Sequence, residues 1–229
     1  MEINEFKIRC SAISGIMTKP KKKDDLISAG AKTYCKKWLT ERIYDRKEDV
    51  SSKYMDKGNI MEDNSIDFIA EYLDYGSLLK NEHFYENDFM TGTPDLITGD
   101  GIIEIKNSWN CFTFPLFEDD IPNKGYFYQV QGYMHLTGLK KAKLIYTLMD
   151  TPEHLIEKEY RFKSSNTYME YDEFKEKYLY DKIQDNFKIK IFEIDYDESV
   201  IDDIYDRVTN CRKYIDLLLE KTNHYKLTA

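Results

Sequence analysis

The stretch GTPDLITGDGIIEIKNSW, residues 92–109, carries the strongest fold signal in this chain of 229 residues. Gly99-Asp100 matches a two-residue β-hairpin turn of the Gly-X kind, and residues 95–98 and 102–106 read as its two strands. This turn places Asp95 directly opposite Glu104. Because side chains alternate along a strand, Lys106 is expected on the same face as Glu104.

Two carboxylates that face each other across a hairpin repel and destabilise the strand pair. The pairing of Asp95 with Glu104 therefore predicts a positive charge between them. Lys106 is one candidate, and a divalent cation such as Mg²⁺, which prefers oxygen ligands, is the other. A Glu-x-Lys sequence on a strand is more often a surface ion pair, so the hairpin alone does not predict catalysis.

A third carboxylate is predicted to point inward from a helix over residues 53–74. The apolar residues Ile66 and Ile69 mark the buried face of this helix, and Glu62 lies four residues before Ile66. A carboxylate in that position is costly unless it is paired or binds a metal. Glu62 is therefore expected to face the hairpin acids.

A second predicted helix, residues 124–137, places Gln129 and Tyr133 one turn apart on a shared face. Gln129 can orient a water or a lysine amine, and Tyr133 can donate a hydrogen bond or stack. Three acids, a lysine and a glutamine are the residue types that metal-assisted phosphodiester hydrolysis needs. The carboxylates hold Mg²⁺ against the scissile phosphate, and the lysine positions the attacking water.

The rest of the chain reads as a mixed α/β protein, a single domain over residues 1–229 with its motif core at about 55–150. The apolar spacing from Ile201 to Leu218 predicts a long final helix. The other expected elements are an extended entry at 5–10, a capped helical turn at 11–17, a helix at 26–44, and strands at 84–90, 142–149, 158–163 and 187–191.

Charge is distributed unevenly along the chain. The net charge is −9, but residues 1–60 contain 14 Lys and Arg against nine Asp and Glu, so the remainder is strongly acidic. The basic residues could be solvated surface, but any nucleic acid is expected to bind near this N-terminal third. The four cysteines are scattered, which argues against a zinc or iron–sulfur site. With no apolar stretch near ~18 residues and no basic signal start, a cytoplasmic location is expected.

The combined motifs match a known nuclease signature. Pro94-Asp95 followed by Glu104-x-Lys106 has the form PD-(D/E)xK, with KGNIME (57–62) before it and YFYQVQGYM (126–134) after it. The chain resembles the lambda-exonuclease/YqaJ-type viral recombinase nucleases over roughly residues 5–150. The resemblance implies a restriction-endonuclease-like αβββαβ core, with a central mixed β-sheet flanked by helices.

The resemblance also assigns roles to individual residues. It implies a catalytic lysine and a set of metal ligands that includes one main-chain carbonyl. The implied catalytic residues are Asp95, Glu104, Lys106 and Gln129; the implied metal ligands are Asp95, Glu104, Ile105 and Glu62; the implied DNA contacts are Arg9, Ser11, Thr93 and Tyr133. The phosphate-pocket arginines of the family have no clear counterpart in this sequence.

The function implied by the resemblance is a Mg²⁺-dependent DNA exonuclease, with Mn²⁺ as a substitute and one or two ions bound. Such an enzyme degrades one strand of linear duplex DNA from the 5′ end and leaves 3′ single strands for phage recombination. Implied partners are double-stranded DNA ends and a single-strand annealing protein, in the host cytoplasm. Family members often form ring-shaped homotrimers.

Three other readings stay open at this point. The chain could be another nuclease of the superfamily, either RecB-like or a structure-specific endonuclease. A CRISPR-adaptation nuclease is disfavoured, because the chain lacks the C-terminal group of three cysteines that holds the iron–sulfur cluster. A non-catalytic DNA-end-binding protein is disfavoured because Asp95, Glu104 and Lys106 are all intact. A structural protein whose acids are all surface groups is the remaining alternative.

Overall fold

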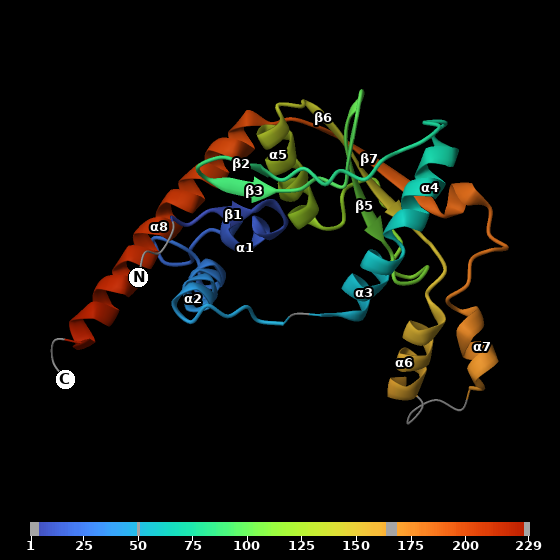
Figure 1. The fold of residues 1–229 in the computed structure, drawn as a ribbon, viewed down its shortest axis with the longest axis horizontal. Coiled ribbons are helices and arrows are strands. Elements are labelled where there is room, and N and C mark those ends of the chain that lie inside the picture. Colours follow the sequence, from blue (N-terminus) through green and yellow to red (C-terminus); the bar gives the residue numbers. More distant parts are fainter. Residues whose placement is uncertain (1–4, 50, 164–168, 227–229) are drawn as a thin grey trace.

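The computed structural model describes residues 5–49, 51–163 and 169–226, and shows two mixed β-sheets flanked by helices (Figure 1). This arrangement confirms the expected α/β class, with two sheets where one central sheet was expected. None of the helices in these three ranges is long and apolar enough to cross a membrane.

The larger sheet contains the predicted hairpin. Its strands are β4 (Leu96–Thr98), β5 (Gly101–Asn107), β6 (Lys141–Thr147) and β7 (Ile189–Asp195), in that spatial order. Leu96 pairs with Ile103 and Thr98 with Gly101, so the predicted register is confirmed. Gly101 has φ 138°, and a Cβ there would lie 2.2 Å from the carbonyl oxygen of Lys141. Glycine is therefore required at the point where β5 passes β6.

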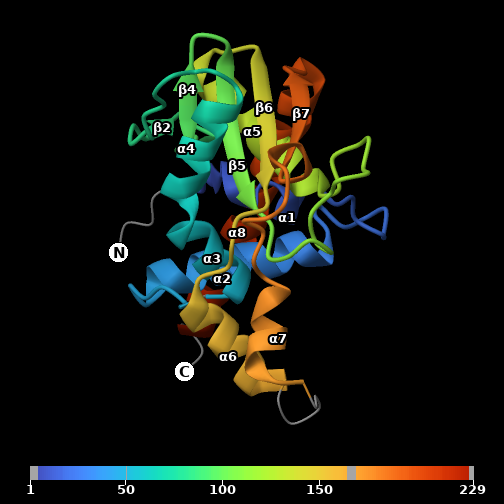
Figure 2. The ribbon, with the colours of Figure 1, turned by 90° about the vertical axis from the view of Figure 1, so that its right-hand side faces the viewer.

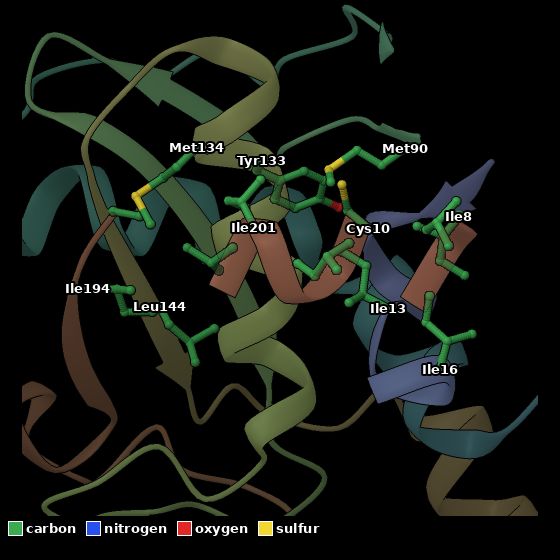
Figure 3. Packing of buried hydrophobic residues seen from close by; sticks show 14 of the residues in the cluster. Ile8, Cys10, Ile13, Ile16, Met90, Tyr133, Met134, Leu144, Ile194 and Ile201 are labelled. Atoms are coloured by element: carbon green, nitrogen blue, oxygen red, sulfur yellow. The ribbon is translucent and has the colours of Figure 1, made fainter. Parts of the chain in front are cut away.

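The crossover from β5 to the parallel strand β6 runs through helix α5 (Lys124–Thr137). Asn123 caps its first turn, and Gly138 ends it in the left-handed conformation with φ 78°. The helix thus has the predicted bounds. Its buried side packs Val130, Tyr133 and Met134 into the main core, and Figure 3 shows Tyr133 and Met134 there.

The smaller sheet holds the N-terminal segment against α5. Strand β1 (Ile8–Arg9) pairs in parallel with β3 (Met90–Gly92), and β2 (Tyr85–Glu86) pairs with β3 on its other side. The short helices η1 (Cys10–Ala12) and α1 (Ser14–Met17) follow β1, as expected for residues 5–17. Figure 3 shows Ile8, Cys10, Ile13 and Ile16 converging on the core beside Tyr133.

Two long helices complete the core. Helix α2 (Ala29–Ile43) begins at Ser28, whose side chain accepts a hydrogen bond from Ala31, and α8 (Glu198–Lys226) packs beside it (Figure 1). The final helix was predicted from its apolar spacing, and Ile201, Ile204 and Val208 are buried as expected.

The predicted single helix over residues 53–74 is wrong. The structure has α3 (Lys53–Ile60) and α4 (Glu62–Tyr72), separated by a break at Met61. The two helices bury side chains against different partners, because Lys57 bonds to loop carbonyls while Ile66 and Ile69 pack on the sheet. A straight helix cannot satisfy both contacts.

The strand predicted at 158–163 is also wrong, because these residues belong to helix α6 (Glu153–Lys163). Leu155 and Ile156 pack with Trp109, and with Phe174 of α7 (Tyr171–Glu176), in a small separate cluster. Phe187, expected in a strand, lies in the 3₁₀ turn η3 (Asp185–Phe187), and β7 begins two residues later. In Figure 2, α6 and α7 project below the sheet.

Candidate active site

The predicted hairpin brings its acids and its lysine together at one end of β5. Asp95 directly precedes β4, and its Oδ2 accepts a hydrogen bond from the main-chain N–H of Ile105 at 2.8 Å. Glu104 is only 1% exposed, and its Oε1 accepts a hydrogen bond from Lys106 Nζ at 2.5 Å. In this structure Lys106 supplies the positive charge that the facing carboxylates require.

A side chain of helix α5 also bonds to the Glu104 carboxylate. Gln129 Nε2 donates to Glu104 Oε1 at 2.6 Å and to the hydroxyl of Tyr133 at 3.0 Å. The main chain of Gly92 lies against the Tyr133 ring, and a Cβ at Gly92 would stand 2.5 Å from Cε1 of that ring. Glycine at this position therefore lets β3 and α5 approach closely enough to hold Tyr133.

The buried position of these groups shifts their protonation equilibria. Burial and the nearby Glu104 raise the pKa of Asp95 well above its ordinary value. Burial opposes the charge on Lys106, but the Glu104 and Asp95 carboxylates outweigh it and raise the Lys106 pKa. Burial and Glu104 likewise raise the pKa of the Tyr133 hydroxyl and of the Cys10 thiol. Lys106 is thus an ammonium at neutral pH, and Tyr133 and Cys10 stay neutral.

A cavity of about 510 Å³ opens beside this cluster, between α3 and the end of β5. Asp95, Lys106 and the predicted third acid Glu62 all line it. Glu62 begins α4 and pairs with Lys80 at 2.6 Å, so it lies at the cavity wall rather than in contact with the other acids. The remaining lining residues are Tyr54, Met55, Gly58, Asn59, Ile105, Asn107, Ser108, Trp109, Thr113, Tyr126 and Tyr146.

The donor set fits a hard cation at the hairpin. Glu104 Oε2 is buried and has no hydrogen-bond partner among the described residues, which is costly for a carboxylate oxygen. The N–H of Ile105 points to the edge that β4 has left, so its carbonyl points to that same edge. Asp95, Glu104 and the Ile105 carbonyl are therefore oxygen donors of the kind Mg²⁺ takes. Within the three described ranges, however, no three His, Cys, Asp or Glu side chains already form a metal-holding group.

The predicted DNA contacts are placed less centrally. Arg9 and Ser11 are exposed on either side of buried Cys10, and Thr93 is exposed two residues before Asp95. None of these three residues belongs to the described cavity lining. Arg9 lies next to Tyr34 instead, where its charge partly offsets the rise that burial causes in the Tyr34 pKa.

Sequence reasoning missed three residues around the cavity. Asn107 Oδ1 accepts hydrogen bonds from Ser65 of α4 and Thr147 of β6, at 2.8 and 2.9 Å. The Tyr126 ring lies 4.7 Å from Lys106 Nζ. Asn107 could have been suspected as the residue after Lys106, and Tyr126 as the residue one turn before Gln129.

Lys57 is the third missed residue. It is fully buried, and its Nζ donates to the carbonyls of Met149 and Trp109 at 2.6 and 3.2 Å. Burial lowers the pKa of Lys57 to about 7. Its contacts lie far away in the sequence, so no local pattern marks it as buried.

Comparison with known proteins gives structural matches over nearly the whole chain. No protein-family model and no curated protein matches the sequence. A phage-related exonuclease from Haemophilus somnus 129PT is similar, with a TM-score of 0.80 and 28% identity, over 96% of this chain and 97% of that one. The alkaline exonuclease LHK-Exo of Laribacter hongkongensis shares the fold at 18% identity, with a TM-score of 0.65. A second LHK-Exo structure, solved in complex with dAMP, has a TM-score of 0.66.

The LHK-Exo structures cover 97% of this chain and 94% of their own, so the likeness extends beyond the motif core to the final strand and helix. The hairpin register, the Glu104–Lys106 contact and Gln129 on α5 all agree with the motif order read from the sequence. These findings confirm the resemblance: the chain has the PD-(D/E)xK nuclease fold of the lambda-exonuclease/YqaJ-type family.

Proposed function

We propose that this chain is a metal-dependent DNA exonuclease that removes nucleotides from the 5′ ends of linear duplex DNA. The observation that carries the proposal is the hairpin cluster of Asp95, Glu104 and Lys106, with an unpaired buried oxygen on Glu104, at the wall of an open cavity. The exonuclease neighbours support a nuclease that acts on DNA.

Asp95, Glu104 and the carbonyl of Ile105 would hold one Mg²⁺ or Mn²⁺, and Glu62 would support a second ion or its waters. When bound, the ion would polarise the scissile phosphate and lower the pKa of a water. Asp95 would have to lose any proton that its raised pKa retains.

Lys106 and Gln129 have different parts in this proposal. Lys106 lines the cavity as an ammonium, so it can donate a hydrogen bond to the attacking water and offset negative charge on the phosphate. Gln129 does not line the cavity. Because it is bonded to Glu104 and Tyr133, it orients the carboxylate and acts as a positioning residue.

The DNA would approach the cavity past the N-terminal third. Helix α1 lies beside the start of α5, since a Cβ at Gly125 would be 3.2 Å from Ser14 Oγ. The exposed lysines Lys19, Lys21, Lys22 and Lys23 follow α1 directly. This basic segment would contact the phosphate backbone, with the exposed residues Arg9, Ser11 and Thr93 contributing nearer the strand end. Tyr133, also expected to contact DNA, is buried and bonded to Gln129, so it would help to position Gln129 instead.

The biological role proposed here is the production of 3′ single strands for phage recombination in the host cytoplasm. A homotrimer ring around the duplex and a single-strand annealing protein as partner are part of the same proposal. Both follow from the family resemblance.

The test uses linear duplex DNA labelled separately at its 5′ and 3′ ends. Wild type and Lys106→Ala are incubated with it in Mg²⁺ or in EDTA, with Lys141→Ala, an exposed lysine outside the cavity, as the matched control. We expect stepwise release of 5′ nucleotides by wild type and by Lys141→Ala in Mg²⁺ only, and none by Lys106→Ala.

Three other outcomes would change the assigned function or mechanism. Cleavage of circular DNA would make the chain an endonuclease on the same chemistry. DNA retention in a gel shift without any cleavage would support the non-catalytic end-binding reading. Cleavage by Lys106→Ala at the wild-type rate would remove Lys106 from the mechanism.

A further inference from the structure

Strand β7 is the outermost strand of the larger sheet, with β6 on one side only (Figure 2). Its hydrogen bonds show which main-chain groups face outward. The N–H of Tyr196 bonds to the carbonyl of Lys140, and the N–H of Leu148 bonds to that of Lys188. Hydrogen-bonded pairs alternate with non-bonded pairs along an antiparallel ladder. The main-chain N–H and C=O groups that point toward β6 are therefore those of Lys190, Phe192 and Ile194. The main-chain groups of Ile189, Ile191 and Glu193 therefore face outward, and no described residue bonds to them.

A groove of about 720 Å³ runs beside this free edge. Half-buried apolar side chains form its floor and continue into the core: Ile121, Phe127, Tyr128, Ile191 and Val200. They come from the loop before α5, from α5, from β7 and from the start of α8. An extended segment lying along β7 would cover these side chains while it pairs with the strand edge.

Five exposed carboxylates surround the apolar floor: Asp119, Asp120, Glu193, Asp197 and Asp203. Lys124 is the one cation among the described lining residues, and it lies 5.7 Å from the Tyr128 ring. Asp197 accepts hydrogen bonds from Ser199 at the start of α8, and the other four carboxylates make no ion pair within the described residues. This rim repels the phosphates of DNA and attracts cationic side chains.

We propose that the β7 groove, defined by these apolar and acidic residues, binds an extended segment of a protein partner in which basic and apolar residues alternate. The segment adds to the sheet as a fifth strand through the outward groups of Ile191 and Glu193. Its apolar side chains cover Phe127, Tyr128 and Val200, and its basic side chains meet the acidic rim. The site lies outside the nuclease cavity and does not depend on the proposed activity.

The chain's own basic segment does not match this groove. Residues 18–23, Thr-Lys-Pro-Lys-Lys-Lys, contain no large apolar side chain to cover the floor, and Pro20 lacks the N–H that strand pairing uses. The observations therefore favour a different protein as the occupant over a second copy of this chain.

The probe is a library of random eight-residue peptides displayed on phage and selected against the full-length protein. The Glu193→Lys/Asp203→Lys variant serves for counter-selection. Asp172→Lys/Asp181→Lys, which makes the same charge change at exposed positions outside the groove, is the matched control. We expect the selected peptides to alternate basic and apolar residues, and to bind the groove variant at least about tenfold more weakly than wild type or control.

Two further measurements test whether the bound peptide pairs with the main chain of β7. Bound peptide should slow hydrogen exchange at the Ile191 and Glu193 amides, and methylation of alternate peptide nitrogens should abolish binding. Selected peptides that are not basic, that bind the groove variant equally well, or that leave these amides unprotected would overturn the proposal. A wild-type oligomer that Glu193→Lys/Asp203→Lys dissociates would assign the edge to a second copy, and competition by an oligonucleotide would assign it to nucleic acid.

Discussion

Asp95 and Glu104 are two carboxylates held near each other within one short hairpin, Glu104 buried and Asp95 half-buried at the cavity wall. Three donors hold them there, namely the Ile105 N–H, Lys106 and Gln129. One oxygen of Glu104 still lacks a partner. At the scale of single residues these groups therefore lower the stability of the fold while suiting the site to a cation.

The Asp95→Asn variant tests this conflict between stability and function. Burial and Glu104 raise the Asp95 pKa, so the folded state at neutral pH is penalised when the side chain is ionised. The amide keeps an oxygen to accept from Ile105 and carries no charge. We expect the variant to lose cleavage but to gain stability, by ~1 kcal/mol or a few degrees in Tm.

The gain in stability of Asp95→Asn over wild type should become smaller as the pH falls. Since the raised pKa lets folded Asp95 take up a proton as the pH falls, the penalty disappears toward the ordinary pKa of 3.8. Thermal unfolding at pH 7 and pH 4.5 should therefore show a smaller gain at pH 4.5. Asp67→Asn, an exposed acid on α4, is the control, and an equal effect of both substitutions would contradict the explanation.

Gly92→Ala tests the close approach that holds Tyr133. A methyl group at Gly92 would be 2.5 Å from the Tyr133 ring, so the ring must shift and its bond to Gln129 weakens. We expect kcat to fall ~10-fold, with a stability loss of about 1 kcal/mol. Gly99→Ala, where an added Cβ meets no atom within 4 Å, should leave kcat unchanged. A normal kcat for Gly92→Ala would show that the Tyr133 position does not matter.

At the scale of elements, Lys57 joins helix α3 to the loops that follow β5 and β6. Its two carbonyl acceptors, Trp109 and Met149, lie at the ends of those loops nearest the sheet. Thr151 donates to the same Trp109 carbonyl at 3.1 Å. This contact sets the distance between α3 and β5, and therefore the width of the cavity that both elements line.

The burial of Lys57 predicts a pH-dependent stability. Its pKa is about 7 in the folded protein against an ordinary 10.5, so the unfolded chain binds more protons between these values. Wild-type stability should therefore rise relative to Lys57→Met as the pH increases through this window, by ~2 kcal/mol between pH 7 and pH 9. Urea unfolding of both proteins at the two pH values measures the difference. A constant difference would mean that Lys57 keeps its proton throughout, and Lys141→Met is the control.

The sequence predicts the elements that short-range patterns determine. The hairpin around Gly99-Asp100 and helix α5, from its Asn123 cap to Gly138, have the expected positions. The shared face of Glu104 and Lys106 in the hairpin follows from strand periodicity, and that of Gln129 and Tyr133 in α5 from helix periodicity. The family resemblance placed Gln129 and Glu104 in one site, but their direct hydrogen bond was not predicted by it or by any local pattern.

Other elements depend on contacts between distant residues. The break at Met61 follows from the burial of Lys57 between two loops, and helix α6 follows from packing on Trp109 and Phe174. These contacts join residues that are distant in the sequence. Helix and strand propensities alone therefore predicted one continuous helix at 53–74 and a strand at 158–163, both wrongly. The β7 groove could not be predicted from the sequence either, because its acids come from three separate segments.

At the scale of the whole molecule, basic residues are concentrated in the N-terminal part of the sequence, while the chain as a whole is acidic. The exposed lysines of residues 19–23 follow α1, while the acids of the β7 groove lie beside the start of α8. A net charge of −9 repels nucleic acid over most of the surface. DNA is thus expected to bind only along the basic N-terminal third.

Charge reversal of this segment gives a quantitative test. Lys21→Glu/Lys22→Glu/Lys23→Glu should weaken duplex binding and reduce the slope of log K against log salt by about 2–3, the value for three lost phosphate contacts. Fluorescence anisotropy in Ca²⁺, across a salt series, measures the slope. Lys177→Glu/Lys182→Glu/Lys221→Glu, exposed lysines elsewhere, makes the same change in net charge. Equal slopes for the two triple variants would place the DNA on another surface.

The contact between Lys57 and Met149 also governs the order in which the protein can be completed. The two residues are 92 positions apart, and chains emerge from the ribosome with the N-terminus first. Helix α3 can bond to Trp109 earlier, but it cannot make its shorter bond until Met149 has been translated, more than 40 positions after both hairpin acids. The cavity wall that α3 contributes is therefore expected to reach its final position after the hairpin and α5, which carry Asp95, Glu104, Lys106 and Gln129, have been synthesised.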